Sequence, residues 1–141
     1  MFRPAKNLDF NADPLLAMYG KILANHITVY AAHTNLDDAP GGMNDWLAEQ
    51  LQLEHVQSWL PNPDAPEVSM GRVGELAEPM SMQAFAEYCK TRFKIGGLRL
   101  ISHEPTKQVS KVAILGGDGG KFFREEQATG ADVYVTGGVY Y

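Results

Sequence analysis

The sequence predicts an α/β fold with mixed sheets and flanking helices, and two observations carry this prediction. Segments with helical spacing alternate with β-branched segments along the whole chain. Residues 111–115 and 131–136 are short apolar strands, separated by a helical segment at residues 121–128. Strands joined through a helix lie parallel, so the last third of the chain is expected to be a parallel strand–helix–strand unit.

Local capping signals place the helices. Asp13-Pro14 is typical of an N-cap followed by a first-turn proline and opens a helix that extends to about Asn25. Ser81 is the expected N-cap of another helix, which ends near Phe93 and buries Cys89. Between these two lies a helix over residues 45–53, for which Asn44 is the expected N-cap and Trp46, Leu47 and Leu51 the inward face.

The remaining segments suggest how the chain is divided. Residues 27–33 are expected to form a strand, and residues 67–76 a short strand interrupted by Gly71 and Gly74. Three prolines between residues 61 and 66 predict an irregular connector. We therefore expect a first α/β segment at 1–60, a connector at 61–70, and a second α/β segment at 71–141.

Composition excludes several classes of function. A net charge of −5 over 141 residues argues against a general nucleic-acid binder, although a pocket for a phosphate-bearing small molecule stays open. The only hint of a basic end is the segment from Phe2 to Lys6. No apolar run is long enough to cross a bilayer, and a lone cysteine, Cys89, allows no intramolecular disulfide. A cytoplasmic protein is expected.

The candidate metal ligands are His33 and Asp37. In an extended strand, side chains four residues apart point to the same face, so these two converge if the strand persists to Asp37. An imidazole nitrogen beside a carboxylate oxygen suits a divalent transition metal, but two ligands make at most half a site. The alternative is a strand that ends in a hydrogen-bonded turn. Asp38 is expected to be a solvated turn acid, and Asp45 a first-turn acid on its helix.

A second candidate is the glycine-rich loop from Gly116 to Gly120. Backbone amides between a strand and a helix can hold an anion, to which Lys121 would add positive charge. The spacing matches neither the phosphate-binding P-loop nor the dinucleotide-binding glycine motif. A tight turn that lets the strand and the helix pack closely is the favoured interpretation.

Larger blocks of sequence carry a family resemblance. The stretch from Val29 to Asp37, ending in His-Thr-Asn-Leu-Asp, is followed at residues 39–48 by Ala-Pro-Gly-Gly-Met-Asn-Asp-Trp-Leu-Ala. This block closely resembles the Nif-three-like dinuclear metal-centre proteins, also labelled type 2 GTP cyclohydrolase I homologues. The resemblance continues through Phe2-Arg3-Pro4, Tyr19-Gly20-Lys21, Gly71-Arg72-Val73-Gly74, Pro79-Met80, residues 112–120 and residues 130–137.

The resemblance implies a toroidal homohexamer in which each subunit holds two divalent ions, zinc, iron or manganese. Asp37 matches the metal-binding aspartate of the family, and His33 matches a histidine beside that site. Further ligands would come from a His-His-Pro motif before this sequence and a His-x-x-x-Glu motif after it, so both ends are interpreted as cuts and the family fold as incomplete.

The function implied is a dinuclear-metal hydrolase acting on a nucleotide-like substrate. This chain by itself is expected to bind metal weakly and to lack turnover. The alternative is a non-enzymatic, ring-forming regulatory or scaffold protein whose metals are structural.

Overall fold

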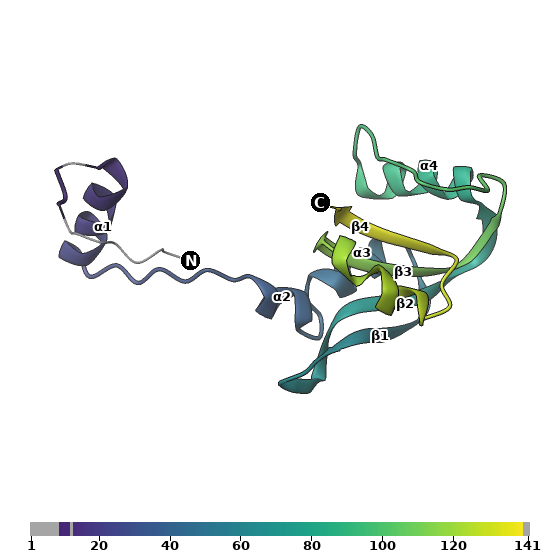
Figure 1. The fold of residues 1–141 in the computed structure, drawn as a ribbon, viewed down its shortest axis with the longest axis horizontal. Helices are drawn as coiled ribbons and strands as arrows, with labels where there is room; N and C mark the ends of the chain where they lie inside the picture. Colours follow the sequence, from purple (N-terminus) through teal and green to yellow (C-terminus); the bar gives the residue numbers. More distant parts are fainter. Residues whose placement is uncertain (1–8, 12, 140–141) are drawn as a thin grey trace. The chain divides into compact units, whose positions relative to one another are not determined.

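The computed structural model describes residues 9–11 and 13–139, which form two compact units, Met1–His33 and Thr34–Tyr141. Each unit is considered by itself. The described residues confirm the α/β prediction (Figure 1). The basic segment from Phe2 to Lys6 and the chain end at Tyr141 lie outside the described residues.

The first unit contains helix α1, Pro14–Ala24. The carboxylate of Asp13 accepts a hydrogen bond of 2.6 Å from the amide of Leu15, which confirms the predicted N-cap and first-turn proline. The strand expected at residues 27–33 is wrong, because that segment has no regular secondary structure. Strand-forming side chains need a partner strand to complete a ladder, and no described strand pairs with this segment.

The second unit is built on a sheet of four described strands in the order β1-β2-β3-β4. Their bounds are Glu54–Asn62, Ala65–Ser81, Gln108–Asp118 and Val133–Gly138. β1–β2 and β2–β3 pair antiparallel, whereas β3 and β4 pair parallel. The 3₁₀ turn η1, Gly120–Phe122, and helix α5, Phe123–Gln127, connect the parallel pair. The predicted parallel strand–helix–strand unit is therefore confirmed.

The proline-rich segment is not irregular as predicted, because it forms the tip of the β1–β2 hairpin. Pro61 pairs with Ser69 and Asn62 pairs with Ala65, with a register shift between these two pairs. The side chain of Asn62 accepts a hydrogen bond of 2.9 Å from the amide of Asp64, which closes the turn. β1 lies at the edge of the sheet, where a missing amide hydrogen costs no ladder bond on the open side.

Strand β2 also runs without interruption through Gly71 and Gly74, where a break was expected. Gly71 lies against the indole of Trp59, and a Cβ atom there would come within 2.3 Å of the ring. The absence of a side chain lets the neighbouring strand pack closely, so this glycine maintains the sheet instead of breaking it.

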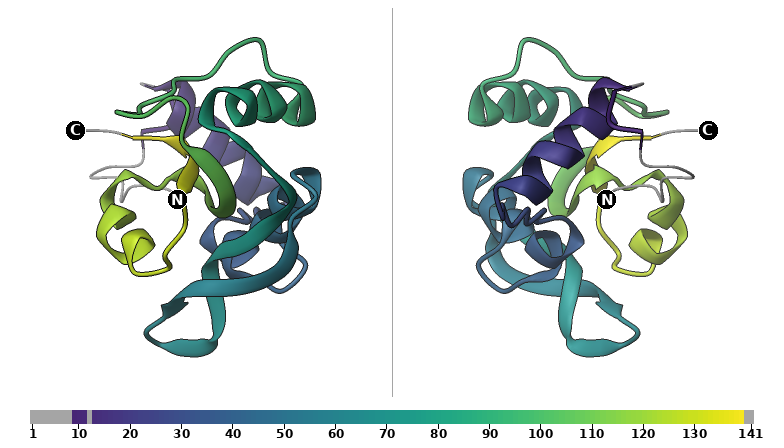
Figure 2. Two further views of the ribbon diagram at one scale, coloured as in Figure 1. Left: turned by 90° about the vertical axis from the view of Figure 1, so that its right-hand side faces the viewer. Right: turned by 90° about the vertical axis from the view of Figure 1, so that its left-hand side faces the viewer.

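Side chains alternate between the two faces of the central strand β3. Val112 and Ile114 belong to the cluster packed beneath α3, Met43–Gln50, and α4, Met82–Phe93, whereas Ala113 and Leu115 pack with Trp59 on the other face. All four β3 side chains are fully buried, as expected of a strand covered on both faces. Within the second unit, Figure 2 shows α3 and α5 on opposite sides of the sheet.

Helix α4 confirms two predictions. The hydroxyl of Ser81 accepts a hydrogen bond of 3.2 Å from the amide of Ala84, so Ser81 is the N-cap. Cys89 is buried in the core, and this burial raises the pKa of its thiol to about 12. In α3, however, Leu51 at the C-cap is buried as predicted while Trp46 is half exposed, so the inward assignment of Trp46 was wrong.

Candidate functional site

Asp37 lies on α2, a single helical turn over Thr34–Asp38. The convergence of His33 and Asp37 was predicted for an extended strand. The chain is instead helical from Thr34 to Asp38, so that prediction does not apply. His33 precedes α2, is exposed, and belongs to the first unit. The structure thus removes the geometric argument for the pair, and Asp37 has to be judged from its own surroundings.

The carboxylate of Asp37 is half-buried, and its Oδ1 atom is shielded from solvent without a hydrogen-bond partner. A buried carboxylate oxygen that lacks a donor is energetically costly, and a bound cation is one remedy. Asp37 therefore fits the part of a carboxylate ligand to a divalent ion. This fit rests on the buried oxygen, independently of the sequence motif.

Asn44 supports Asp37 from α3 and is not the N-cap that was predicted; Gly42 occupies that position. The Asn44 side chain is fully buried. Its Nδ2 donates to the backbone carbonyl of Asp37 at 3.1 Å, and its Oδ1 accepts from the amide of Gly116 at 2.7 Å. One side chain thereby joins the two segments that sequence analysis had treated as separate candidates.

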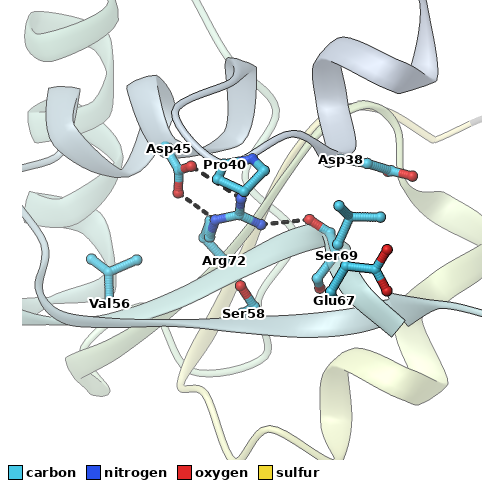
Figure 3. A pocket seen from close by; sticks show the side chains of 9 residues that line it. Asp38, Pro40, Asp45, Val56, Ser58, Glu67, Ser69 and Arg72 are labelled. Atoms are coloured by element: carbon cyan, nitrogen blue, oxygen red, sulfur yellow. Dashed lines mark hydrogen bonds and ion pairs between the residues drawn. The ribbon is translucent and has the colours of Figure 1, made fainter. Parts of the chain in front are cut away.

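Asp45 lies in the first turn of α3, as predicted, but it also forms an ion pair that the sequence did not reveal. Arg72 of β2 donates from Nε to Oδ1 and from Nη2 to Oδ2, the latter at 3.0 Å (Figure 3). The amide of Gly41 adds a hydrogen bond of 2.6 Å. The hydrogen bonds from Arg72 hold the pKa of Asp45 below its usual value.

The remaining donors of Arg72 point at backbone carbonyls. Nη1 donates to the carbonyl of Ser69 at 2.5 Å and to that of Gly71 at 3.0 Å, and Nη2 donates to that of Ala39 at 3.5 Å. The Arg72 side chain is only 5% exposed. Its role is consequently to fix the loop between α2 and α3 onto the hairpin, since its donors are all directed at protein atoms.

Asp38 is buried, so the prediction of a solvated turn acid was wrong. Its Oδ2 accepts from the side-chain amide of Asn62 at 3.0 Å, while its Oδ1 is buried without a hydrogen-bond partner. Asp38 lines an open pocket of about 280 Å³ together with Glu67 and Ser58 (Figure 3). This end of the pocket therefore carries negative charge.

The glycine-rich segment is largely occupied by internal hydrogen bonds. β3 continues to Asp118, so only part of the segment is the loop that was predicted. The hydroxyl of Thr136 donates to the carbonyl of Gly117 and accepts from the amide of Gly119, both at 3.0 Å. With the amide of Gly116 bound to Asn44, this arrangement supports the tight-turn interpretation over an anion cradle.

Three further observations agree with that interpretation. A Cβ atom on Gly119 would come within 2.3 Å of the Tyr134 hydroxyl, so glycine is required there for packing. The ammonium group of Lys121 lies 4.8 Å from the ring centroid of Phe122. Helix α5, which follows, has only five residues.

The described part of the chain contains no group of three or more His, Cys, Asp or Glu side chains arranged to hold a metal ion. Asp37 thus fits as a single ligand, and the described residues alone do not assemble a complete centre. No helix among them is long and apolar enough to span a membrane.

These features define an α/β protein with a mixed sheet and a carboxylate-bearing helical turn anchored to its central strand. The chain belongs to the Duf34/NIF3 (NGG1p interacting factor 3) family, whose model matches residues 1–141. It is 35% identical over 144 residues to a GTP cyclohydrolase 1 type 2 homolog of Streptococcus pneumoniae and 41% identical over 246 residues to the Bacillus subtilis homolog of that name.

Coverage of these relatives is partial. All of this chain matches, but it spans only 53% of the Streptococcus protein and 65% of the Bacillus subtilis protein. A crystal structure of a Bacillus cereus protein related to NIF3 superposes with a TM-score of 0.79 at 24% identity, covering 100% of this chain and 64% of that one. This likeness confirms the fold.

Proposed function

We propose that this chain carries part of a divalent-metal site, with Asp37 as a carboxylate ligand and His33 as a residue beside the site. The observation that supports this most directly is the buried Oδ1 of Asp37, which has no hydrogen-bond partner. A bound divalent ion would act as a Lewis acid on an oxygen of a substrate or of water. Asp37 contributes one negative oxygen ligand and is oriented through its own backbone carbonyl.

For the longer protein, we propose a hydrolase that acts on a nucleotide-like substrate. The names of the relatives, GTP cyclohydrolase 1 type 2 homolog, support this substrate class. Two divalent ions per subunit, a homohexamer and a cytoplasmic location are further parts of the proposal. The chain as given spans about half the length of the Streptococcus relative, and it is proposed to bind metal weakly without turnover.

The first test is a Zn²⁺ titration of the 141-residue chain, in which binding is measured by calorimetry and by shifts of the backbone amide NMR signals. We expect weak binding that shifts the amide signal of Asp37 and is lost in Asp37→Asn. The matched control is Asp64→Asn, which changes an exposed aspartate in the hairpin turn and should leave the titration unchanged. Equal binding by the wild type and by Asp37→Asn would contradict the assignment of Asp37 as a ligand.

The strength of binding tests the second part of the proposal. A micromolar or tighter site in this chain, abolished by Asp37→Asn, would show that the chain alone holds a complete centre. In a full-length relative, metal-dependent release of formate or phosphate from GTP would support the hydrolase. If removal of the metal dissociates the oligomer and no metal-dependent turnover of GTP is found, the scaffold alternative is favoured.

A further inference from the structure

Asn44 is a fully buried residue whose side-chain amide forms one hydrogen bond to the backbone of the proposed ligand Asp37 and one to Gly116 of β3. We propose that Asn44 is the positioning residue of Asp37. Its side chain holds the helical turn that carries the carboxylate and fixes the position of this turn relative to strand β3. This inference rests on the proposed metal-binding function. It assigns a role to a residue that sequence reasoning had placed at a helix cap.

Helix α2 cannot hold this geometry by itself. It has five residues, and a helix of about one turn is not stable in isolation because nucleation is costly. Its position must come from contacts with the rest of the unit. The 3.1 Å bond from Asn44 Nδ2 to the Asp37 carbonyl is such a contact, and it acts on the backbone of the ligand residue itself.

The other end of the Asn44 amide is bound to strand β3. Oδ1 of Asn44 accepts from the amide of Gly116, which directly follows the fully buried Leu115 in β3. A Cβ atom at Gly116 would come within 3.2 Å of the Leu47 side chain and 3.5 Å of Asn44 Oδ1. The amide therefore lies in a closely packed site, where a change of its shape or hydrogen bonding is transmitted to Asp37.

The backbone between α2 and α3 is also closely packed, around Gly42. A Cβ atom at Gly42 would come within 2.1 Å of the backbone carbonyl of Leu36 and 2.8 Å of that of Ala39. The last turn of α2 thus lies directly against the start of α3. A rotation of α3 or a loss of the Asn44 amide would therefore move the Asp37 backbone.

The matched comparison is Asn62, whose side-chain amide binds the neighbouring residue of the same helical turn. Asn62 Nδ2 donates to Asp38 Oδ2 at 3.0 Å. Both asparagines therefore support α2, but only Asn44 acts on Asp37. Partners that orient a metal ligand typically change metal affinity by about 10- to 100-fold when removed. We expect that loss for Asn44→Ala and a change of less than about twofold for Asn62→Ala.

The experiment titrates Zn²⁺ into the wild-type chain, Asn44→Ala and Asn62→Ala, with urea unfolding of each variant as a check on folding. Asn44→Ala that folds and binds Zn²⁺ as tightly as the wild type would overturn the positioning role. If wild type and Asp37→Asn bind equally, the proposed function fails as well. If Zn²⁺ binding is lost in Asp37→Asn but unchanged in Asn44→Ala, the positioning role is wrong and the proposed function stands.

A measurement on the wild type covers the case in which Asn44→Ala does not fold. Zn²⁺ should shift the side-chain amide signal of Asn44 and the backbone amide signal of Gly116 along the same binding curve as that of Asp37. A shift at Asp37 without one at Asn44 and Gly116 would show that the bridge does not respond to the metal, and would overturn the proposal.

Discussion

Arg72 of β2 and Asp45 of α3 form a two-point ion pair that joins the sheet to the helix after the Asp37 turn. Arg72 is almost fully buried, whereas about a third of the Asp45 side chain is exposed. The pair also spans 27 residues of sequence, so it forms only when the hairpin and α3 have come together.

Replacing Arg72 should destabilise the second unit strongly. Arg72→Met removes the partner of Asp45 and the hydrogen bonds that Arg72 donates to the carbonyls of Ser69 and Gly71. Removal of one partner from a buried pair costs about 3–5 kcal/mol, and the partial exposure of Asp45 reduces this to roughly 2–4 kcal/mol. Urea denaturation measures the difference in the free energy of unfolding.

The control for this substitution is Lys90→Met, which removes an ion pair with Glu87 on the surface of α4. An exposed pair of this kind contributes less than about 1 kcal/mol. An equal loss of stability in Arg72→Met and Lys90→Met would mean that the burial of Arg72 does not increase the contribution of its ion pair to the free energy of unfolding.

The same pair gives a pH dependence with a defined sign. Because Arg72 lowers the pKa of Asp45 in the folded state, folding gains stability above the ordinary carboxyl pKa of 3.8 and loses it as the pH falls through the folded value. Asp45→Asn should therefore be less stable than the wild type at neutral pH. The two stability curves should converge in acid. Curves that stay parallel from neutral pH into acid would contradict this prediction.

Gly71 tests the packing between β1 and β2. A Cβ atom there would come within 2.3 Å of the Trp59 ring, which is buried and donates from Nε1 to the carbonyl of Arg72 at 2.9 Å. Gly71→Ala should cost about 1–3 kcal/mol, since overpacking a fixed ring forces it out of place. In a Trp46→Phe background, the fluorescence of Trp59 should shift to the red as the indole becomes exposed.

Gly96→Ala is the matched control, because no heavy atom lies within 4 Å of a Cβ at that position. Its free energy of unfolding should stay within roughly 0.5 kcal/mol of the wild type. A Gly71→Ala protein as stable as Gly96→Ala would show that Trp59 can move without cost.

The sequence predicted those features that depend on neighbouring residues. The caps formed by Asp13 and Ser81 reach amides only two and three residues away, so composition alone reveals them. The parallel pairing of β3 and β4 also follows locally, since a helix connects the two strands. The strand expected at residues 27–33 failed because strand propensity needs a partner that the local sequence does not identify.

The candidate site depended instead on distant partners. Asn44 beside Asp45 has the local pattern of a helix start, and nothing nearby indicates that its amide binds Gly116, 72 residues away. Arg72 lay in a block recognised only through resemblance, and its partner Asp45 was explained by helix charge alone. Sequence reasoning thus proposed Asp37 as a ligand but could not identify the residues that contact its helical turn, because those contacts are long-range.

Thr136 offers a last test, directed at the glycine-rich segment. Its hydroxyl donates to the Gly117 carbonyl and accepts from the Gly119 amide, so it closes the turn between β3 and η1. Thr136→Val keeps the shape and β-branching but leaves both backbone groups without a partner, at a cost of about 1–3 kcal/mol. Hydrogen exchange of the Gly119 amide should accelerate more than that of core amides in β3.

The comparison variant is Thr91→Val. In the wild type, the hydroxyl of Thr91 donates to the Glu87 carbonyl on the exposed side of α4. That carbonyl remains accessible to water, so the loss should be smaller, within about 1 kcal/mol. If the Gly119 amide exchanges at the wild-type rate in Thr136→Val, the hydroxyl does not hold the turn. The segment would then be kept in place by the close packing of Gly119 against Tyr134, and Gly119→Ala would be the substitution that opens it.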